Sequence, residues 1–318
     1  MKNIVVLATG GTIAGISNQF SPAGYLAGQI HISQILNSIP NINSLANIHA
    51  VQFSNIDSKD ISEIFLLNLA NKVNQFLNDS LVDGIVITHG TDSIEESAFF
   101  IHLTSNSSKP VIFTGAMRPA TSFSPDGPEN LFDAVSVAAD DTASGVLVVF
   151  NKFILSPIFI SKHHTTAVNA FDSDNPAGFI FNHKPNFYFQ PVKNFSFDIP
   201  KNLPAVKIIY AHANDDGLFI RAAVNSNVKG IVYAGFGNGS ISKIVEDELN
   251  FAAKNNIIII RSSRVNSGAV FSNDTNFIDS GFLNPQKARI LLQLALTKTN
   301  DREKIREIFK SVNMFSIS

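Results

Sequence analysis

One stretch near the start organises this chain: Val5-Val6-Leu7-Ala8-Thr9-Gly10-Gly11-Thr12-Ile13-Ala14-Gly15. Its short apolar run is typical of a buried strand, and we expect the strand to stop at the Gly10-Gly11 pair. Glycine can make a sharp turn with its backbone pressed against a neighbour at little steric cost. The first side chain after this turn is the hydroxyl of Thr12, so the strand is predicted to carry a threonine at its carboxyl end.

A second stretch repeats this plan. Gly84-Ile85-Val86-Ile87-Thr88 is predicted to form a strand, and His89-Gly90-Thr91-Asp92 is its polar end. In open parallel α/β sheets, ligands bind in the crevice outside the carboxyl ends of the strands. Two threonines, one carboxylate and several backbone N–H groups at that edge predict a site for acyl chemistry.

Alternating strand and helix patterns run through most of the chain. The 3.6-residue helical period occurs over 61–77 and 129–139, and short apolar runs lie on either side of these segments. Such alternation predicts a parallel sheet with right-handed crossovers. Because 318 residues are many for one core, we expect an α/β fold with a larger N-terminal, doubly wound, mostly parallel sheet domain and a smaller C-terminal α/β domain.

Composition suggests where these domains meet. The segment 151–189 is irregular and aromatic, and after it the periods vanish among Pro, Asn, Lys and Ser residues. We predict an N-terminal α/β catalytic domain over 1–189, a linker over 190–205 and the smaller C-terminal α/β domain over 206–318.

Two polar residues at predicted helix starts have an alternative, structural role. Asp92 and Glu95 have the spacing of a capping box. Asp92 is therefore either a site residue or a helix cap, a role typically worth about 1 kcal/mol. Ser240 follows a glycine-rich turn and is expected to cap a helix over 241–255.

Composition excludes several classes of protein. The net charge of −2 provides no basic surface for nucleic acid or an acidic membrane, and no apolar run approaches the roughly 20 residues of a membrane helix. The chain has no cysteine, which excludes disulfides and thiolate catalysis. Since the first strand is expected to begin near Asn3, we expect no signal peptide and a cytoplasmic protein, or a periplasmic one if Met1 replaces a cleaved leader.

Other motifs predict no cofactor and no metal. The glycine-rich turns near Gly11 and Gly237 lack both the dinucleotide spacing and the lysine of a phosphate loop. His163 and His164 are adjacent, without a carboxylate at ligand spacing. The chain also has no G-x-S-x-G elbow of a serine hydrolase.

The polar residues expected at the crevice leave two hypotheses open. A threonine hydroxyl is a poor nucleophile unless a base activates it, and a lysine serves as a base only if its pKa falls, which a paired aspartate opposes. The sequence therefore does not decide which hydroxyl attacks. Threonine-dependent acyl transfer and simple small-molecule binding both fit the candidates Thr12, Tyr25, Ser58, Thr91, Asp92 and Lys162.

The residues also resemble those of a known family. Ala8–Gly15 and Ile87–Asp92 are similar to the two signature segments of the bacterial type II L-asparaginases, including the glutaminase-asparaginase branch. Further similar segments occur in order along nearly the whole chain: 115–119, 126–131, 261–264 and 283–289.

This resemblance implies a hydrolase that releases ammonia from L-asparagine through a covalent acyl-threonine. Thr12 matches the nucleophile and Tyr25 its partner on a mobile loop. Thr91, Asp92 and Lys162 match the second catalytic group. The resemblance also implies a homotetramer, built as a dimer of intimate dimers whose sites are completed by the neighbouring subunit.

The resemblance implies substrate-binding roles as well. Ser58 matches the ligand of the substrate α-carboxylate, and Asp92 also holds the α-amino group. Backbone N–H groups near Gly11 and Thr91 match the oxyanion hole. Ala116, within the similar segment 115–119, is expected to line the substrate site.

The sequence departs from the asparagine-selective pattern in three places. Lys59 stands where a glutamine or glutamate is usual, so it must turn away, pair with a neighbouring aspartate, or weaken binding of a free amino acid. Ser240 replaces an asparagine that enters the partner subunit's site, which favours an L-glutaminase side activity. The chain is shorter between Gly268 and Gly281, where the family has an interface glutamate; Asp274 is the nearest acid and Asp279 a weaker candidate.

We therefore predict an amidohydrolase that converts L-asparagine to L-aspartate, with L-glutamine as a second substrate. Two alternatives stay open. One is an amidase for another substrate, such as a peptide-linked or tRNA-linked amide. The other is an amino-acid binding module without catalysis.

Overall fold

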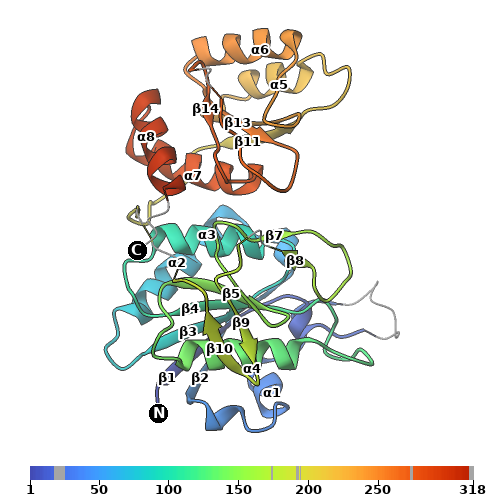
Figure 1. The fold of residues 1–318 in the computed structure, drawn as a ribbon, viewed down its shortest axis with the longest axis vertical. Coiled ribbons are helices and arrows are strands. Elements are labelled where there is room, and N and C mark those ends of the chain that lie inside the picture. Colours follow the sequence, from blue (N-terminus) through green and yellow to red (C-terminus); the bar gives the residue numbers. More distant parts are fainter. Residues whose placement is uncertain (18–25, 173–174, 191–192, 194, 273–274, 315–318) are drawn as a thin grey trace. The chain divides into compact units, whose positions relative to one another are not determined.

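The computed structural model describes the chain except for residues 18–25, 173–174, 191–192, 194, 273–274 and 315–318. It divides into two compact units, Met1–Pro191 and Val192–Ser318 (Figure 1). Among the described residues, no helix is long and apolar enough to cross a membrane.

The N-terminal unit is built on an eight-stranded sheet of order β10-β9-β6-β5-β4-β3-β1-β2. The strand that precedes Thr12 lies between two parallel neighbours. Its carboxyl end is therefore flanked by two other strand ends, as the expected crevice requires. The five parallel strands are β1 (Asn3–Gly10), β2 (Asn47–Ile56), β3 (Gly84–Thr88), β4 (Val111–Thr114) and β5 (Val146–Phe150).

Helices cover both faces of this sheet, which makes the N-terminal unit doubly wound (Figure 1). Alternate residues of β1 (Ile4, Val6 and Ala8) pack with two helices, α1 and α4, in one apolar core. The helices α2 and α3 pack against each other on the opposite face. The helices of this unit are α1 (Ile32–Asn37), α2 (Glu63–Leu77), α3 (Ile94–Thr104) and α4 (Gly127–Ala139), with short 3₁₀ turns at Thr12–Ala14, Ile42–Ser44 and Ser58–Asp60.

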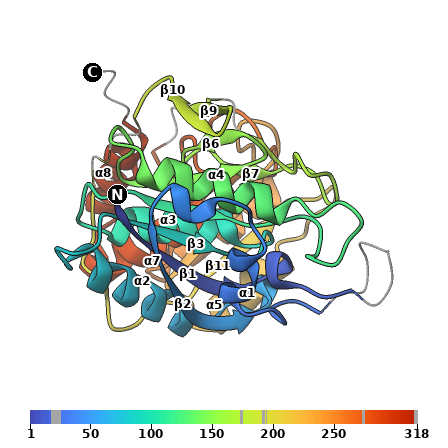
Figure 2. The ribbon, with the colours of Figure 1, turned by 90° about the horizontal axis from the view of Figure 1, so that it is seen from below.

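The segment after β5 is more regular than its sequence suggests. We expected 151–189 to be irregular, but it adds three antiparallel strands to the sheet, and they lie beside α4 (Figure 2). Two tight turns, at Asn151-Lys152 and Asn182-His183, have positive φ at both residues, from 45° to 70°, which is the geometry that hairpin turns favour. The strands of this segment are β6 (Phe153–Leu155), β7 (Ser161–Lys162), β8 (Phe171–Asp172), β9 (Gly178–Phe181) and β10 (Lys184–Phe187).

The C-terminal unit has a parallel sheet of order β11-β12-β13-β14. Two helices, α5 and α6, share an apolar core with one face of it. A third helix, α7, contacts β11, β12 and β13. The elements are β11 (Val206–Tyr210), α5 (Leu218–Asn225), β12 (Gly230–Gly235), α6 (Lys243–Lys254), β13 (Ile258–Ser263), β14 (Ile278–Asp279), α7 (Pro285–Lys298) and α8 (Arg302–Asn313).

The structure corrects the expected cap of α6. That helix begins at Lys243 with Ser242 at the N-cap, so Ser240 does not cap it. Ser240 instead exchanges two backbone hydrogen bonds with Phe236, of 2.7 and 2.9 Å, and closes the glycine-rich turn. Because the chain reverses there, the helix cannot begin until two residues later.

Candidate active site

The turn after β1 depends on its two glycines. Gly10 and Gly11 have φ of 112° and 79°, in the region that disfavours side chains. The N–H of Gly11 donates to the carbonyl oxygen of Ile56 at the end of β2, at 3.0 Å. Thr12 follows at the start of a 3₁₀ turn and is 5% exposed. The turn therefore fixes the backbone that leads into Thr12 against the end of the neighbouring strand.

Gly90 joins three strand ends. A side chain on Gly11 would collide with the backbone of Gly90, and a side chain on Gly90 would collide with the Cβ and Oγ of Ser58. The ends of β1, β3 and β2 therefore meet through two glycines and a serine, and only glycine fits at either position. The sequence pattern predicts a role for Gly11 but none for Gly90, although Gly90 also follows a buried strand and precedes a threonine, as Gly11 does.

Thr91, Asp92 and Lys162 form a connected polar cluster. Lys162 comes from β7, 70 residues after Asp92, and its Nζ donates to Thr91 Oγ1 at 3.0 Å and to Asp92 Oδ1 at 2.7 Å. The Thr91 residue is buried, whereas the Asp92 side chain is 53% exposed. One ammonium thus connects a buried hydroxyl to a carboxylate that is open to solvent.

Ser58 is hydrogen-bonded to Asp92 and to the residue that follows it. Its Oγ accepts a hydrogen bond from the backbone N–H of Asp92 at 3.2 Å, and its carbonyl accepts one from Ser93 Oγ at 2.6 Å. The helix α3 begins at Ile94 with Ser93 at the N-cap position, and no side-chain cap bond forms there. The capping-box alternative for Asp92 is therefore wrong, because its carboxylate contacts Lys162 instead.

His89 lies between β3 and Gly90 in the chain and was not among the predicted site residues. It is fully buried, and its Nδ1–H donates to the carbonyl oxygen of Gly90 at 2.7 Å. Burial lowers the pKa of His89 to about 4, although the hydrogen bond to Gly90 acts in the opposite direction. His89 is therefore neutral near pH 7, and it holds the carbonyl of the peptide that precedes Thr91.

Ala116 lies in a segment after β4 whose backbone is hydrogen-bonded to a side chain. Its side chain is fully buried. The next two backbone N–H groups, of Met117 and Arg118, each donate to a carboxylate oxygen of Asp126 at 2.9 Å. This segment therefore has a defined backbone conformation, set by one aspartate ten residues after Ala116.

Lys59 pairs with Asp57, one of the arrangements expected from the sequence. Its Nζ lies 2.9 Å from Asp57 Oδ2, and its side chain is 65% exposed. It directly follows Ser58, so an ammonium–carboxylate pair lies next to the buried serine of the cluster.

The remaining predicted residues lie outside this cluster or outside the described residues. Tyr25 and Asp274 both belong to the segments that the structure does not describe. Ser240 is an exposed residue of the C-terminal unit. Asp279, also in that unit, accepts hydrogen bonds from Ser272 N and Oγ at 2.7 and 3.2 Å. Asp279 therefore has an internal partner.

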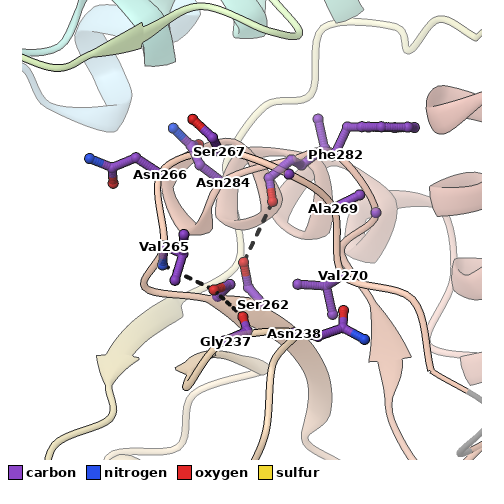
Figure 3. Close-up of a pocket in the computed structure, with 14 residues that line it drawn as sticks. Gly237, Asn238, Ser262, Val265, Asn266, Ser267, Ala269, Val270, Phe282 and Asn284 are labelled. Atoms are coloured by element: carbon purple, nitrogen blue, oxygen red, sulfur yellow. Dashed lines mark hydrogen bonds between the residues drawn. The ribbon is translucent and has the colours of Figure 1, made fainter. Parts of the chain in front are cut away.

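A separate cavity of about 190 Å³ lies in the C-terminal unit, at the ends of β12 and β13 (Figure 3). Ser263 Oγ donates to the carbonyl of Gly237 at 2.6 Å, and Val265 N donates to Ser263 Oγ at 3.0 Å. The described residues that line this cavity include no charged side chain. It is a small hollow in which the Ser263 hydroxyl is already bonded to the backbone of the cavity wall.

Fold and site together define a two-unit α/β protein in which a threonine, a lysine and a carboxylate are joined by hydrogen bonds after one strand of a mostly parallel sheet, while the neighbouring strand end that precedes Thr12 packs against the same turn. Two family models match this chain: "Asparaginase, N-terminal" over residues 3–193 and "Glutaminase/Asparaginase C-terminal domain" over residues 205–309. The chain belongs to the asparaginase family. The family resemblance and the fold class inferred from the sequence are confirmed.

Individual relatives are similar in sequence to this chain over nearly its full length. The chain is 43% identical to L-asparaginase 2 of Escherichia coli, over 97% of this chain and 93% of that protein. It is 39% identical to the glutaminase-asparaginase of Pseudomonas fluorescens, over 97% of this chain and 90% of that protein. A crystal structure of a probable cytoplasmic L-asparaginase from Campylobacter jejuni superposes with a TM-score of 0.94 at 42% identity, and covers 98% of this chain and all of that one.

Proposed function

We propose that this protein hydrolyses the side-chain amide of L-asparagine to L-aspartate and ammonia, with L-glutamine as a second substrate. One observation carries the proposal: Lys162 Nζ contacts both Thr91 Oγ1 and Asp92 Oδ1. Gly11 packs against the backbone of Gly90, which supports a site that combines this cluster with Thr12. Membership of the asparaginase family supports the same reaction.

The proposed reaction has two acyl-transfer steps. The Thr12 hydroxyl attacks the amide carbon, its proton passes to the departing nitrogen, and ammonia leaves a threonine ester. Water then attacks this ester, and its proton returns to the Thr12 oxygen as aspartate is released. Thr91, Lys162 and Asp92 relay protons in these steps, and backbone N–H groups near Gly11 and Thr91 stabilise the oxyanion, a contribution typically of about 3–4 kcal/mol per donor.

Substrate binding is proposed for the groups around this cluster. Ser58 binds the α-carboxylate and Asp92 the α-amino group, while Ala116 lines the site. Tyr25 assists Thr12. Completion of the site by Ser240 and Asp274 of a neighbouring copy requires an oligomer, and we propose a homotetramer built as a dimer of dimers.

Domain limits and compartment are part of the same proposal. We propose a linker over 190–205 between a catalytic domain, 1–189, and a smaller domain, 206–318, which limited proteolysis would test. We propose a cytoplasmic location, and cell fractionation would distinguish it from a periplasmic one.

Ammonia release with L-asparagine and L-glutamine, measured side by side over a wide concentration range, tests the activity. The wild type should act on both, whereas Thr12→Ala should release no ammonia and Lys162→Met should lose about 10²–10⁴-fold in kcat. Mass spectrometry of an acid-quenched reaction should detect the acyl-enzyme on a Thr12 peptide. A folded Thr12→Ala variant with activity near wild type would refute the proposal.

A second candidate function follows from the Lys59–Asp57 pair. A free α-ammonium group that binds beside Ser58 meets the Lys59 ammonium nearby, whereas an N-acylated asparagine brings no such charge. Lys59→Gln should lower KM for L-asparagine about fivefold, since a largely exposed pair is worth at most about 1 kcal/mol, and should leave KM for N-acetyl-asparagine unchanged. Wild-type preference for N-acetyl-asparagine would favour an amidase for blocked substrates.

A further inference from the structure

His89 is a buried titratable residue to which the proposed reaction gives no role. It is 0% exposed, and its ring packs edge-on to that of Phe113, with the ring centroids 5.9 Å apart. Among the described residues, no group is hydrogen-bonded to its Nε2, which is also buried. A general acid or base must lie within reach of the proton that it transfers. An imidazole enclosed in this way does not touch a substrate, so any effect on the reaction has to pass through its other nitrogen.

That other nitrogen, Nδ1, contacts the carbonyl oxygen of Gly90 at 2.7 Å. A carbonyl oxygen only accepts hydrogen bonds, so Nδ1 carries the proton. Gly90 is buried, and no other group in the described part of the chain donates to this oxygen. Because glycine has no side chain that restricts its backbone, and because a buried carbonyl needs a donor, the orientation of the Gly90–Thr91 peptide depends on His89.

The backbone of His89 holds this donor in place. Its own N–H donates to the carbonyl oxygen of Thr114, at the end of β4, at 2.8 Å. A side chain on Gly115 would come within 2.4 Å of the His89 carbonyl oxygen, so the chain that follows β4 packs closely against it. The imidazole therefore acts from a fixed position beside the ends of β3 and β4.

The Gly90–Thr91 peptide also carries the backbone N–H of Thr91. A trans peptide is planar and has its carbonyl and its N–H on opposite sides, so fixing the oxygen fixes the direction of the N–H. Within the described residues this N–H has no hydrogen-bond acceptor, whereas the Thr91 hydroxyl accepts from Lys162 at 3.0 Å. A hydrogen bond to the carbonyl also polarises the peptide, which makes its N–H a stronger donor.

We propose that His89 is a positioning residue, which aims the N–H of Thr91 at the oxyanion that forms when the substrate amide is attacked. Its Nδ1–H holds one side of the peptide, and the N–H on the other side is the oxyanion donor. A donor that is aligned before the reaction stabilises the developing charge without reorganisation. This inference rests on the proposed function and deepens it, because it names the group that orients one donor of the oxyanion hole.

Substitutions at position 89 separate the hydrogen bond from the packing. In His89→Asn the amide nitrogen takes nearly the place of Nδ1 and remains a donor, whereas His89→Leu fills a similar space and donates nothing. His89→Gln, whose amide nitrogen lies nearer the place of Nε2, replaces His89→Leu if that variant does not fold. The matched control is His102→Leu, which removes another buried histidine, in the last turn of α3. Circular dichroism and urea denaturation check folding, and kcat and KM for L-asparagine are measured for each variant.

His89→Leu should lose at least about tenfold in kcat, and at most the loss of about 10²–10³-fold that is typical of one missing oxyanion donor. KM should stay nearly unchanged, because this interaction forms only in the transition state. His89→Asn and His102→Leu should both keep kcat close to that of the wild type. The proposal would be overturned by equal losses of kcat in His89→Asn and His89→Leu, by an equal loss in His102→Leu, by a change in KM alone, or by a folded His89→Leu variant with wild-type kcat.

Crystal structures of the two position-89 variants give a measurement that does not depend on activity. The Gly90 carbonyl should keep its direction in His89→Asn and turn away in His89→Leu, and an unchanged direction in both would contradict the positioning role. A wild type that releases no ammonia would refute the proposed activity instead, and the two structures would then decide whether His89 orients the peptide.

Discussion

Asp133 of α4 connects two hairpins of the N-terminal unit, and replacing it with asparagine tests how they are held. Its carboxylate is 1% exposed. Oδ2 lies 2.7 Å from Lys152 Nζ, in the turn between β5 and β6, and Oδ1 lies 2.7 Å from His183 Nδ1, in the turn between β9 and β10. One buried charge thus fixes both turns of the antiparallel end.

The loss of stability expected for Asp133→Asn depends on the charged partner that Lys152 keeps. Removing one partner of a buried ion pair typically costs about 3–5 kcal/mol, but Lys152 keeps Glu129 at 2.6 Å and is partly exposed. We therefore expect Asp133→Asn to cost about 2–3 kcal/mol, which is roughly 4–12 °C in Tm for a domain of this size. Urea and thermal denaturation measure both quantities.

The effect should also depend on pH. Burial lowers the pKa of Lys152, but hydrogen bonds from its ammonium to Asp133 and Glu129 outweigh it and raise the pKa above its usual value. A raised pKa means that this stabilisation is complete below the unfolded-state pKa, about 10.5 for lysine. The difference between wild type and Asp133→Asn should therefore persist to about pH 10 and shrink only at higher pH.

The control is Asp141→Asn, which removes an aspartate whose side chain is 92% exposed and paired with Lys2. Its unfolding midpoint should stay close to that of the wild type, since exposed pairs contribute little. An Asp133→Asn variant within about 0.5 kcal/mol of wild type, the range of ordinary surface changes, would refute the reasoning. An equal loss in Asp141→Asn would refute it too.

Three further outcomes are expected. Gly90→Ala should lose at least about 100-fold in kcat/KM, because the new Cβ would collide with Ser58 and small displacements in a site have effects of that size. Activity assays with Gly145→Ala give the comparison: an added Cβ there meets no atom within 4 Å, so its φ of 66° strains the turn without a collision. Burial lowers the pKa of His89 from 6.5 to about 4. The free energy of unfolding should therefore be highest above pH 6.5 and fall by up to about 3 kcal/mol as the pH drops toward 4. Urea titrations at several pH values should show a smaller pH dependence of the free energy of unfolding in His89→Gln. Thr91→Val should lower kcat about 10²–10⁴-fold with Tm nearly unchanged, and a loss in KM alone would contradict the relay role.

The parallel core of the fold was predictable from the sequence because its signals are local. The apolar runs of β1 and β3 end at glycine and threonine, and the helices between strands show the 3.6-residue period. The antiparallel end was missed for equally local reasons. Its strands β6, β9 and β10 are only three or four residues long, and its tight turns use Asn-Lys and Asn-His rather than the Asn-Gly pair that usually marks a hairpin.

The polar cluster could not be predicted from local sequence patterns, because it joins residues that are far apart in the chain. Asp92 has the spacing of a capping box, yet its carboxylate contacts an ammonium 70 residues away. Spacing alone does not decide between a helix cap and a site residue, because the contact of Asp92 with Lys162 depends on where β7 lies in the fold. The candidate roles of Thr12, Thr91 and Lys162 stay predictions until activity is measured, although the contact between Lys162 and Thr91 is direct.

The glycines explain why three distant strand ends can form one site. The sequence predicts a close backbone approach at Gly11 but does not reveal which segment approaches it, and it gives no such role to Gly90. In the structure, the absence of a side chain on Gly11 lets Gly90 approach, and the absence of a side chain on Gly90 lets Ser58 approach. Ser58 can then accept from the N–H of Asp92, and Asp92 is oriented toward Lys162. The geometry of the polar cluster is therefore a consequence of close backbone packing, so a methyl group at position 90 should disrupt the chemistry without touching any of the reacting side chains directly.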